Sequence, residues 1–252
     1  MRGWAAEEAA VALTALQFLT RLQVPSGLHS PARMAASPRW YPAVGALVGG
    51  AAALVWWAAA QALPPLLTAL LAVSAGVLVT GALHEDGLAD TCDGMGGASP
   101  ERALAIMRDS RIGTYGVLGL GFVLAAKVLA LEALPAVPLV LVAGHAASRA
   151  SMVLALATGR YARIEGAATP VAGGLAGGGL GFALGCGLAA LLALALALPW
   201  TAVAGGLVGL AAGHALVRGV AGRRIGGFTG DTLGAVQQLG EAGLYLGVLA
   251  CL

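Results

Sequence analysis

Long apolar runs separated by short polar segments dominate this chain. Each run is about twenty residues long, the length that an α-helix needs to cross the hydrocarbon core of a bilayer. The pattern therefore predicts an all-α, polytopic integral membrane bundle of about seven transmembrane helices, forming one membrane-embedded domain over residues 1–252. The seven predicted spans lie at about 42–63, 64–83, 116–134, 136–157, 175–198, 200–221 and 233–252.

The N-terminal region departs from this pattern. Residues 5–22 are predicted to be helical but are short and amphipathic, with Glu7 and Glu8 early and Arg21 late, the order of charges that the helix dipole favours. We expect an N-terminal interfacial helix here, although a span stays open. Residues 23–41 contain three prolines and are predicted to form an irregular cytoplasmic segment.

The basic residues are distributed asymmetrically about the predicted spans. The proline-containing links near 63–65, 134–138 and 198–200 contain no Lys or Arg. Twelve arginines lie in the other connections and in the N-terminal segment. Because cytoplasmic segments of membrane proteins are enriched in Lys and Arg, we expect these arginines on the cytoplasmic side of a prokaryotic inner membrane.

Composition agrees with a membrane protein. Charged residues make up 10% of the chain, against about 25% in soluble domains. The 39 glycines have two explanations that stay open. They either let helix backbones approach closely in the bilayer, or reflect the base composition of a GC-rich genome.

Four of the 12 acidic residues fall within residues 84–94. Carboxylates beside lipid are costly unless a cation compensates them. Asp86, Asp90 and Asp93 have the spacing i, i+4, i+7, which places them within roughly 60° of arc on a helix. Such a stripe predicts an oxygen-ligand site suited to Mg²⁺ or Mn²⁺. Glu85 points about 100° away, either supporting this site or facing the headgroups. The alternative is a solvated loop that caps a helix.

Several basic residues near this cluster are candidates for substrate contacts. Arg108 and Arg111 precede a predicted span, where they either bind phosphate or anchor the topology. Arg149 lies inside a predicted span and needs compensation from an aspartate of the cluster or from a substrate phosphate. Lys127, also inside a span, is expected to pair with Glu132 or to extend to the interface.

A glycine-rich segment opens the last predicted span. Gly227, Thr229 and Gly230 stand at a helix N-terminus, where backbone amides bind phosphates well. Asp231 is a candidate for a further metal ligand. The alternative is that Asp231 is an ordinary N-cap.

Three of these blocks together resemble the signatures of the cobalamin synthase family, whose members are adenosylcobinamide-GDP ribazoletransferases. The blocks are His84-x-Asp86-Gly-Leu-Ala-Asp90-Thr-x-Asp93-Gly, Met107–Gly116 and Gly227–Gly234. Residues 161–166 are similar as well, and the resemblance extends from about Thr14 to Glu241. It implies Mg²⁺-dependent phosphoryl transfer, in which a hydroxyl of α-ribazole or its 5′-phosphate attacks the β-phosphoryl of adenosylcobinamide-GDP and GMP leaves.

The resemblance also implies roles for the candidate residues. Asp86, Asp90 and Asp93 are then metal ligands, and Glu85, where the family usually has an apolar residue, adds a further candidate ligand. Asp231 is a further ligand or the base for the attacking hydroxyl. Substrate phosphates are assigned to Arg108, Arg111, Arg149, Gly227, Thr229 and Gly230. We expect Mg²⁺ and membrane lipid but no nucleic acid as partners, and the glycine-rich faces permit a homo-oligomer.

Two other functions stay open at this point. An ion-coupled transporter also places acids within its membrane segments. A CDP-alcohol-type lipid phosphotransferase carries the signature D-x-x-D-G-x-x-A-R, which this chain matches only in part. Leu83 replaces the first aspartate and Asp90 replaces the arginine of that signature.

Overall fold

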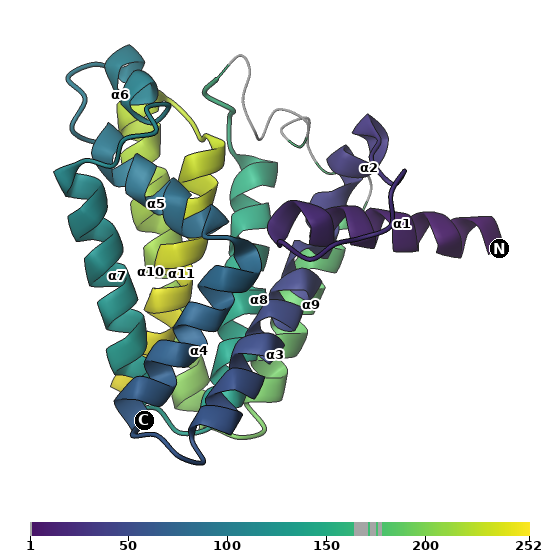
Figure 1. Ribbon diagram of the computed structural model, residues 1–252. Coiled ribbons are helices and arrows are strands. Elements are labelled where there is room, and N and C mark those ends of the chain that lie inside the picture. The colour runs from purple at the N-terminus through teal and green to yellow at the C-terminus, as the bar shows by residue number, and fades with distance from the viewer. Residues whose placement is uncertain (1, 164–170, 172–174, 176–177) are drawn as a thin grey trace.

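The computed structural model describes residues 2–163, 171, 175 and 178–252 (Figure 1). The regular secondary structure of this part of the chain is helical apart from one isolated β-bridge between Tyr161 and Phe228. The fold class is therefore confirmed as all-α. The helices are α1 (Arg2–Leu19), α2 (Pro31–Ala36), the 3₁₀ helix η1 (Ser37–Trp40), α3 (Tyr41–Ala59), α4 (Pro65–Thr80), α5 (Leu83–Gly94), α6 (Pro100–Ile106), α7 (Thr114–Ala133), α8 (Val137–Thr158), α9 (Gly179–Leu194), α10 (Trp200–Ile225) and α11 (Gly230–Ala250).

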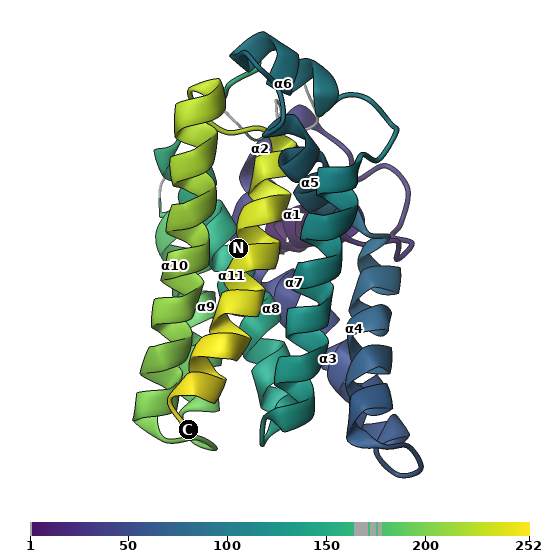
Figure 2. The same cartoon turned by 90° about the vertical axis from the view of Figure 1, so that its left-hand side faces the viewer.

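Long helices lie at each of the predicted spans. They are α3, α4, α7, α8, α9, α10 and α11, which run side by side as a bundle in Figures 1 and 2. In the described part of the chain, four helices are long and apolar enough to cross a membrane, and the bent pair of α4 and α5 makes a fifth if it counts as one span. The protein is thus an integral membrane protein, and the number of seven spans stays a prediction.

The two ends of the bundle differ as the distribution of arginines predicts. The three proline-containing links lie together with the C-terminus at the lower end in Figure 1. Helices α5 and α6 and the arginine-bearing end of α10 lie at the upper end (Figures 1 and 2). The acidic segment therefore shares one end of the molecule with most of the basic connections.

The N-terminal helix lies across the bundle rather than along it (Figure 1). Ion pairs at 2.8 Å and 2.6 Å join Glu7 to Arg33 and Glu8 to Arg39. The segment 23–41 was predicted to be irregular, and this is wrong for α2 and η1. Ser30 starts α2 because its hydroxyl accepts a hydrogen bond from the Arg33 amide at 3.2 Å, and Pro31 suits the first helical position.

Glycines permit the closest helix contacts. A methyl group on Gly209 or Gly243 would overlap the facing backbone of α11 or α10, and one on Gly49 would lie 2.6 Å from the Leu141 carbonyl oxygen of α8. These positions favour close packing as the reason for glycine. Packing does not account for Gly121 and Gly185, where a methyl group would meet nothing within 4 Å.

Candidate active site

A sharp turn between α4 and α5 sets the direction of the acidic helix. Gly81 and Ala82 adopt left-handed backbone conformations with φ of 66° and 60°, and α5 bends away from α4 by 92°. The Arg21 amide donates a hydrogen bond to the Val79 carbonyl at 2.8 Å, which fastens the end of α1 beside the turn. As a result α5 crosses the upper end of the bundle, against α7 and α11 (Figure 1).

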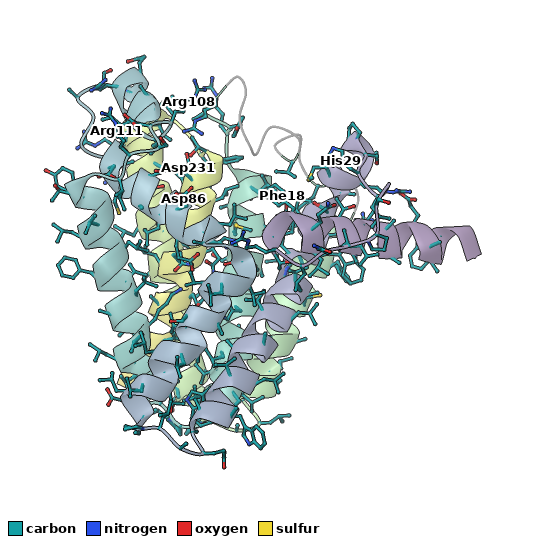
Figure 3. The ribbon with its side chains drawn as sticks, viewed as in Figure 1. Phe18, His29, Asp86, Arg108, Arg111 and Asp231 are labelled. Carbon is teal, nitrogen blue, oxygen red and sulfur yellow. The ribbon has the colours of Figure 1, made fainter. Side chains whose placement is uncertain are left out.

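The acidic motif meets the glycine-rich motif where α5 packs on α11. A methyl group on Gly87 would lie 2.8 Å from the Asp231 carbonyl oxygen, and one on Gly234 would lie 3.4 Å from the Gly87 Cα. This close approach brings Asp86 and Asp231 to the rim of one cavity of about 180 Å³. Figure 3 shows these two side chains near each other, below Arg108.

A second cavity lies on the other side of Asp86. It has a volume of about 280 Å³, and its polar lining includes Asp90, Arg108 and Ser110. Asp86 lines both cavities and is exposed. Arg111 does not line either cavity; its side chain is 87% exposed and pairs with Asp109 at 2.6 Å. This ion pair lowers the pKa of the Asp109 carboxyl to about 2.

Negative charge accumulates at this end of the bundle. We call Asp86, Asp90, Asp93 and Asp231 the mouth cluster. Burial and the charges of the three neighbouring aspartates raise the pKa of the Asp90 carboxyl to about 7. Arg163 opposes this effect, and its guanidinium pairs with Asp231 at 2.8 Å. The mouth cluster therefore favours the binding of a cation.

The carboxylates of the mouth cluster are not drawn together around one point. Among the described residues, no three His, Cys, Asp or Glu side chains are grouped closely enough to hold a metal ion. Mg²⁺ does not need such a group, because it is commonly bound by one or two carboxylates together with water and substrate phosphates. Asp86 and Asp90, which share the polar cavity with Arg108, provide that kind of partial site.

Asp93 differs from the other three aspartates in having two backbone partners. The Gly113 and Gly116 amides donate hydrogen bonds to its two carboxylate oxygens at 2.7 Å and 2.8 Å. Asp93 thus caps the N-terminus of α7 from a neighbouring helix. Each oxygen keeps a further lone pair, so its assignment as a metal ligand stays a prediction.

The start of α11 uses Thr229 rather than Asp231 as its N-cap. The Thr229 hydroxyl accepts a hydrogen bond from the Thr232 amide at 3.3 Å, and the Thr232 hydroxyl accepts one from the Thr229 amide at 2.8 Å. The interpretation of Asp231 as an ordinary N-cap is therefore wrong. Thr229 is fully buried and engaged in this cap, whereas Gly230 lines the 180 Å³ cavity. Gly227 packs against the Arg160 carbonyl, and the phosphate roles of all three stay predictions.

Polar side chains also meet inside the bundle, away from the mouth. We call Glu85, Lys127, His145, Ser148, Arg149, Gln237, Gln238, Glu241 and Tyr245 the buried network. Lys127 pairs with Glu241 at 3.0 Å and donates to Gln238 at 2.6 Å. The prediction that Lys127 pairs with Glu132 is wrong. Lys127 pairs with Glu241 of α11, whereas Glu132 is exposed.

Two predicted site residues belong to this network rather than to the mouth. Glu85 is buried and accepts a hydrogen bond from Gln238 at 2.8 Å. The Arg149 guanidinium is 1% exposed and lies 3.1 Å from both Nδ1 and the carbonyl oxygen of His145. Neither residue lines the two cavities at Asp86. Their roles as metal ligand and phosphate clamp stay predictions that no contact supports.

The structure adds residues that the sequence analysis did not select for the site. Arg163 was counted only among the twelve arginines expected on the cytoplasmic side, yet its guanidinium pairs with Asp231. Its place in the block at residues 161–166 was the available signal, although residues 164–166 lie outside the described part of the chain. Gln237, Gln238 and Glu241 follow one another along α11, and polar residues within an apolar helix were the signal for the buried network.

Comparisons with known proteins point to one family. The family model described as cobalamin-5-phosphate synthase matches residues 11–249. An adenosylcobinamide-GDP ribazoletransferase of Leptothrix cholodnii is 47% identical over 96% of this chain and 96% of its own length. Proteins of the same name from Bradyrhizobium diazoefficiens and Shewanella frigidimarina are 45% and 40% identical, over 92% and 94% of this chain and 90% and 92% of their own lengths. No solved structure matches the chain.

Proposed function

This chain belongs to the cobalamin-5-phosphate synthase family, and we propose that its mouth cluster is the active site of an adenosylcobinamide-GDP ribazoletransferase. The enzyme catalyses the step that assembles the lower ligand of cobalamin. One observation carries the placement of the site: Asp86 of the first motif and Asp231 of the last motif line the same cavity. Residues 145 positions apart in the chain thus present carboxylates to one space.

Mg²⁺ is the cofactor that these residues fit best. The mouth cluster offers carboxylate oxygens, the ligands that Mg²⁺ prefers, and burial together with its excess of negative charge raises the pKa of the Asp90 carboxyl. Asp86 and Asp90 would hold the ion, with Asp93 as the further candidate ligand. Mg²⁺ held there would supply neutralisation of charge on the diphosphate and on the leaving nucleotide.

The remaining groups bind and orient the substrates. Arg108, at the polar cavity beside Asp86 and Asp90, is placed to contact the diphosphate of adenosylcobinamide-GDP through its guanidinium. Asp231 lines the other cavity and accepts the proton of the attacking ribazole hydroxyl, while Arg163 holds its carboxylate in place. Asp86, which lines both cavities, stands where the hydroxyl meets the β-phosphoryl group.

The direct test is a turnover assay on the purified protein in detergent. Adenosylcobinamide-GDP, α-ribazole and Mg²⁺ are mixed with the enzyme, and GMP is measured by chromatography. We expect GMP and the joined corrinoid in equal amounts, loss of turnover with EDTA, and recovery when Mg²⁺ is restored. Absence of GMP at saturating substrates would overturn the proposal.

We further propose that the mouth faces the cytoplasm of a prokaryotic inner membrane. The support is the arginine-rich end of the bundle, which contains α5 and α6 (Figure 1). The exposed Cys251 lies at the opposite end and provides the test. A membrane-impermeant maleimide should label Cys251 from outside intact spheroplasts, and labelling only after lysis would reverse the orientation.

A further inference from the structure

The apolar cavity beside the mouth cluster has a composition that phosphate binding does not explain. It contains about 180 Å³ and is lined by residues from five helices and by Val171. Its walls include Phe18, Tyr41, His84, Met152, Leu156 and Leu233. In Figure 3, Phe18 on α1 and Asp86 on α5 lie at the same level of the molecule, with Asp231 just above Asp86. An apolar chamber thus ends at the two carboxylates.

Aromatic and aliphatic groups form most of this chamber. The rings of Phe18 and Tyr41 stack with their centroids 5.9 Å apart and their planes inclined by 12°. Met152 and Leu156 contribute one face of α8, and both are buried. Such walls bind a flat apolar group through burial and dispersion rather than through hydrogen bonds.

One buried polar atom at the chamber has no partner. His84 is 2% exposed, and its Nε2 makes no hydrogen bond in the structure. A buried nitrogen without a partner costs free energy, so a ligand that supplies one complementary atom gains from pairing with it. The chamber therefore suits a group that is apolar over most of its surface and has a single hydrogen-bonding atom.

Resting on the proposed function, we infer that this chamber binds the aromatic base of the ribazole nucleoside and selects it by size. The base is a benzimidazole, a flat bicyclic group whose free ring nitrogen can pair with the unpartnered Nε2 of His84. With the base in the chamber, the attached ribose lies at Asp86 and Asp231. The diphosphate of the other substrate then occupies the polar cavity on the far side of Asp86.

Volume and polarity exclude the other parts of the two substrates. An apolar cavity of about 150 Å³ accommodates benzene, so a chamber of about 180 Å³ that opens toward the acids accommodates a small bicyclic base. A corrin macrocycle is far too large for it. Guanine has polar atoms around its whole edge, and these would lose their hydrogen bonds to water against apolar walls.

The test alters the volume of the chamber and measures how the enzyme's preference between two bases changes. Met152→Ala enlarges the chamber and should admit α-linked ribosides of naphthimidazole, which has one more fused ring than benzimidazole. We expect the ratio of kcat/KM for the naphthimidazole riboside to kcat/KM for α-ribazole to rise about tenfold or more over wild type. Met152→Phe reduces the space and should raise KM for α-ribazole about tenfold while KM for adenosylcobinamide-GDP stays unchanged.

A variant on the same helix controls for general loosening of the bundle. Leu141→Ala also truncates a buried side chain of α8, about 16 Å along the helix axis from Met152, and should leave the base preference at the wild-type value. An unchanged ratio in Met152→Ala would overturn the inference, as would a rise in KM confined to adenosylcobinamide-GDP in Met152→Phe. If a lipid chain fills the chamber, neither variant changes base selection, which also overturns it.

The wild-type enzyme separates this inference from the proposed function. If the wild-type protein releases no GMP with α-ribazole, the proposed function itself is overturned. Normal GMP release together with an unchanged base preference in both Met152 variants leaves the function in place and removes only the assignment of the chamber.

Discussion

The mouth cluster and the buried network both concentrate charge in an apolar chain, but they balance it differently. In the buried network the two carboxylates of Glu85 and Glu241 are matched by two cations, Lys127 and Arg149. The mouth cluster has four carboxylates, and among the described residues Arg163 makes its one ion pair. The first group neutralises itself inside the bundle, whereas the second has an excess of negative charge at an accessible cavity.

This difference separates two uses of charge in a membrane protein. Polar groups buried among helices stabilise the bundle only when their hydrogen bonds are satisfied within it. Carboxylates left in excess beside a cavity are costly in the free protein and become favourable when a cation and a phosphate bind. We therefore expect changes in the mouth cluster to affect turnover and changes in the buried network to affect stability.

The largest expected effect is on turnover in the mouth cluster. Asp86→Ala or Asp90→Ala should lower kcat/KM for GMP release by more than about 1,000-fold, about 4 kcal/mol of transition-state stabilisation, because each removes a metal ligand. Thermal unfolding in detergent should remain at the wild-type midpoint. Glu101→Gln, an exposed acid on α6 at the same end, serves as the control and should retain activity. Activity retained in Asp86→Ala would remove the metal assignment.

The next effect concerns the stability of the buried network. Lys127→Met should lower the free energy of unfolding by about 3 kcal/mol, because it leaves Glu241 buried without its ammonium partner. Unfolding in a denaturing detergent, followed by circular dichroism, measures this loss. The matched change Glu132→Gln on the same helix should have little effect. An equal loss in Glu132→Gln would contradict the observed pairing.

Two arginines of one loop provide a finer comparison. Arg108→Ala should raise KM for adenosylcobinamide-GDP about tenfold, because Arg108 lines the polar cavity beside Asp86. Arg111→Ala should change kcat/KM less than about twofold, since Arg111 pairs with Asp109 in solvent. Steady-state kinetics with varied adenosylcobinamide-GDP distinguish the two. Equal effects from both variants would show that the loop acts only through its charge.

The smallest expected effect concerns Asp93, which is both a candidate metal ligand and the cap of α7. Asp93→Ala should lower the free energy of unfolding by about 1 kcal/mol, because two amides at the start of α7 lose their acceptor. It should also raise the Mg²⁺ concentration needed for half-maximal turnover. A lower unfolding midpoint with an unchanged Mg²⁺ requirement would reduce Asp93 to a capping residue.

Much of the fold followed from local pattern. The lengths of the apolar runs located the long helices, and prolines located the links, because both depend on properties that act over a few neighbouring residues. The segment containing α2 and η1 was missed because three prolines suggested an irregular chain. Two of these prolines stand at the first positions of short helices, where proline is tolerated.

The candidate site was predictable in its residues but not in their partners. The spacing of Asp86, Asp90 and Asp93 on α5 followed from helix geometry, which is local. That Asp93 caps α7 and that Glu85 faces Gln238 depends on which helices pack against α5, and no spacing within one segment contains that information. The same reason explains why Lys127 was paired with a neighbour in sequence rather than with Glu241 of α11.

The amino-acid sequence determined the membrane class, the positions of the long helices and the presence of an acidic motif beside basic and glycine-rich ones, because hydropathy, charge and helical period are properties of consecutive residues. The packing of α5 on α7 and α11 decided which charges neutralise one another inside the bundle and which remain at the mouth. It also decided that Asp86 separates an apolar chamber from a polar cavity. Cavities and ion pairs arise between segments distant in the chain, so they exist only once the helices have packed.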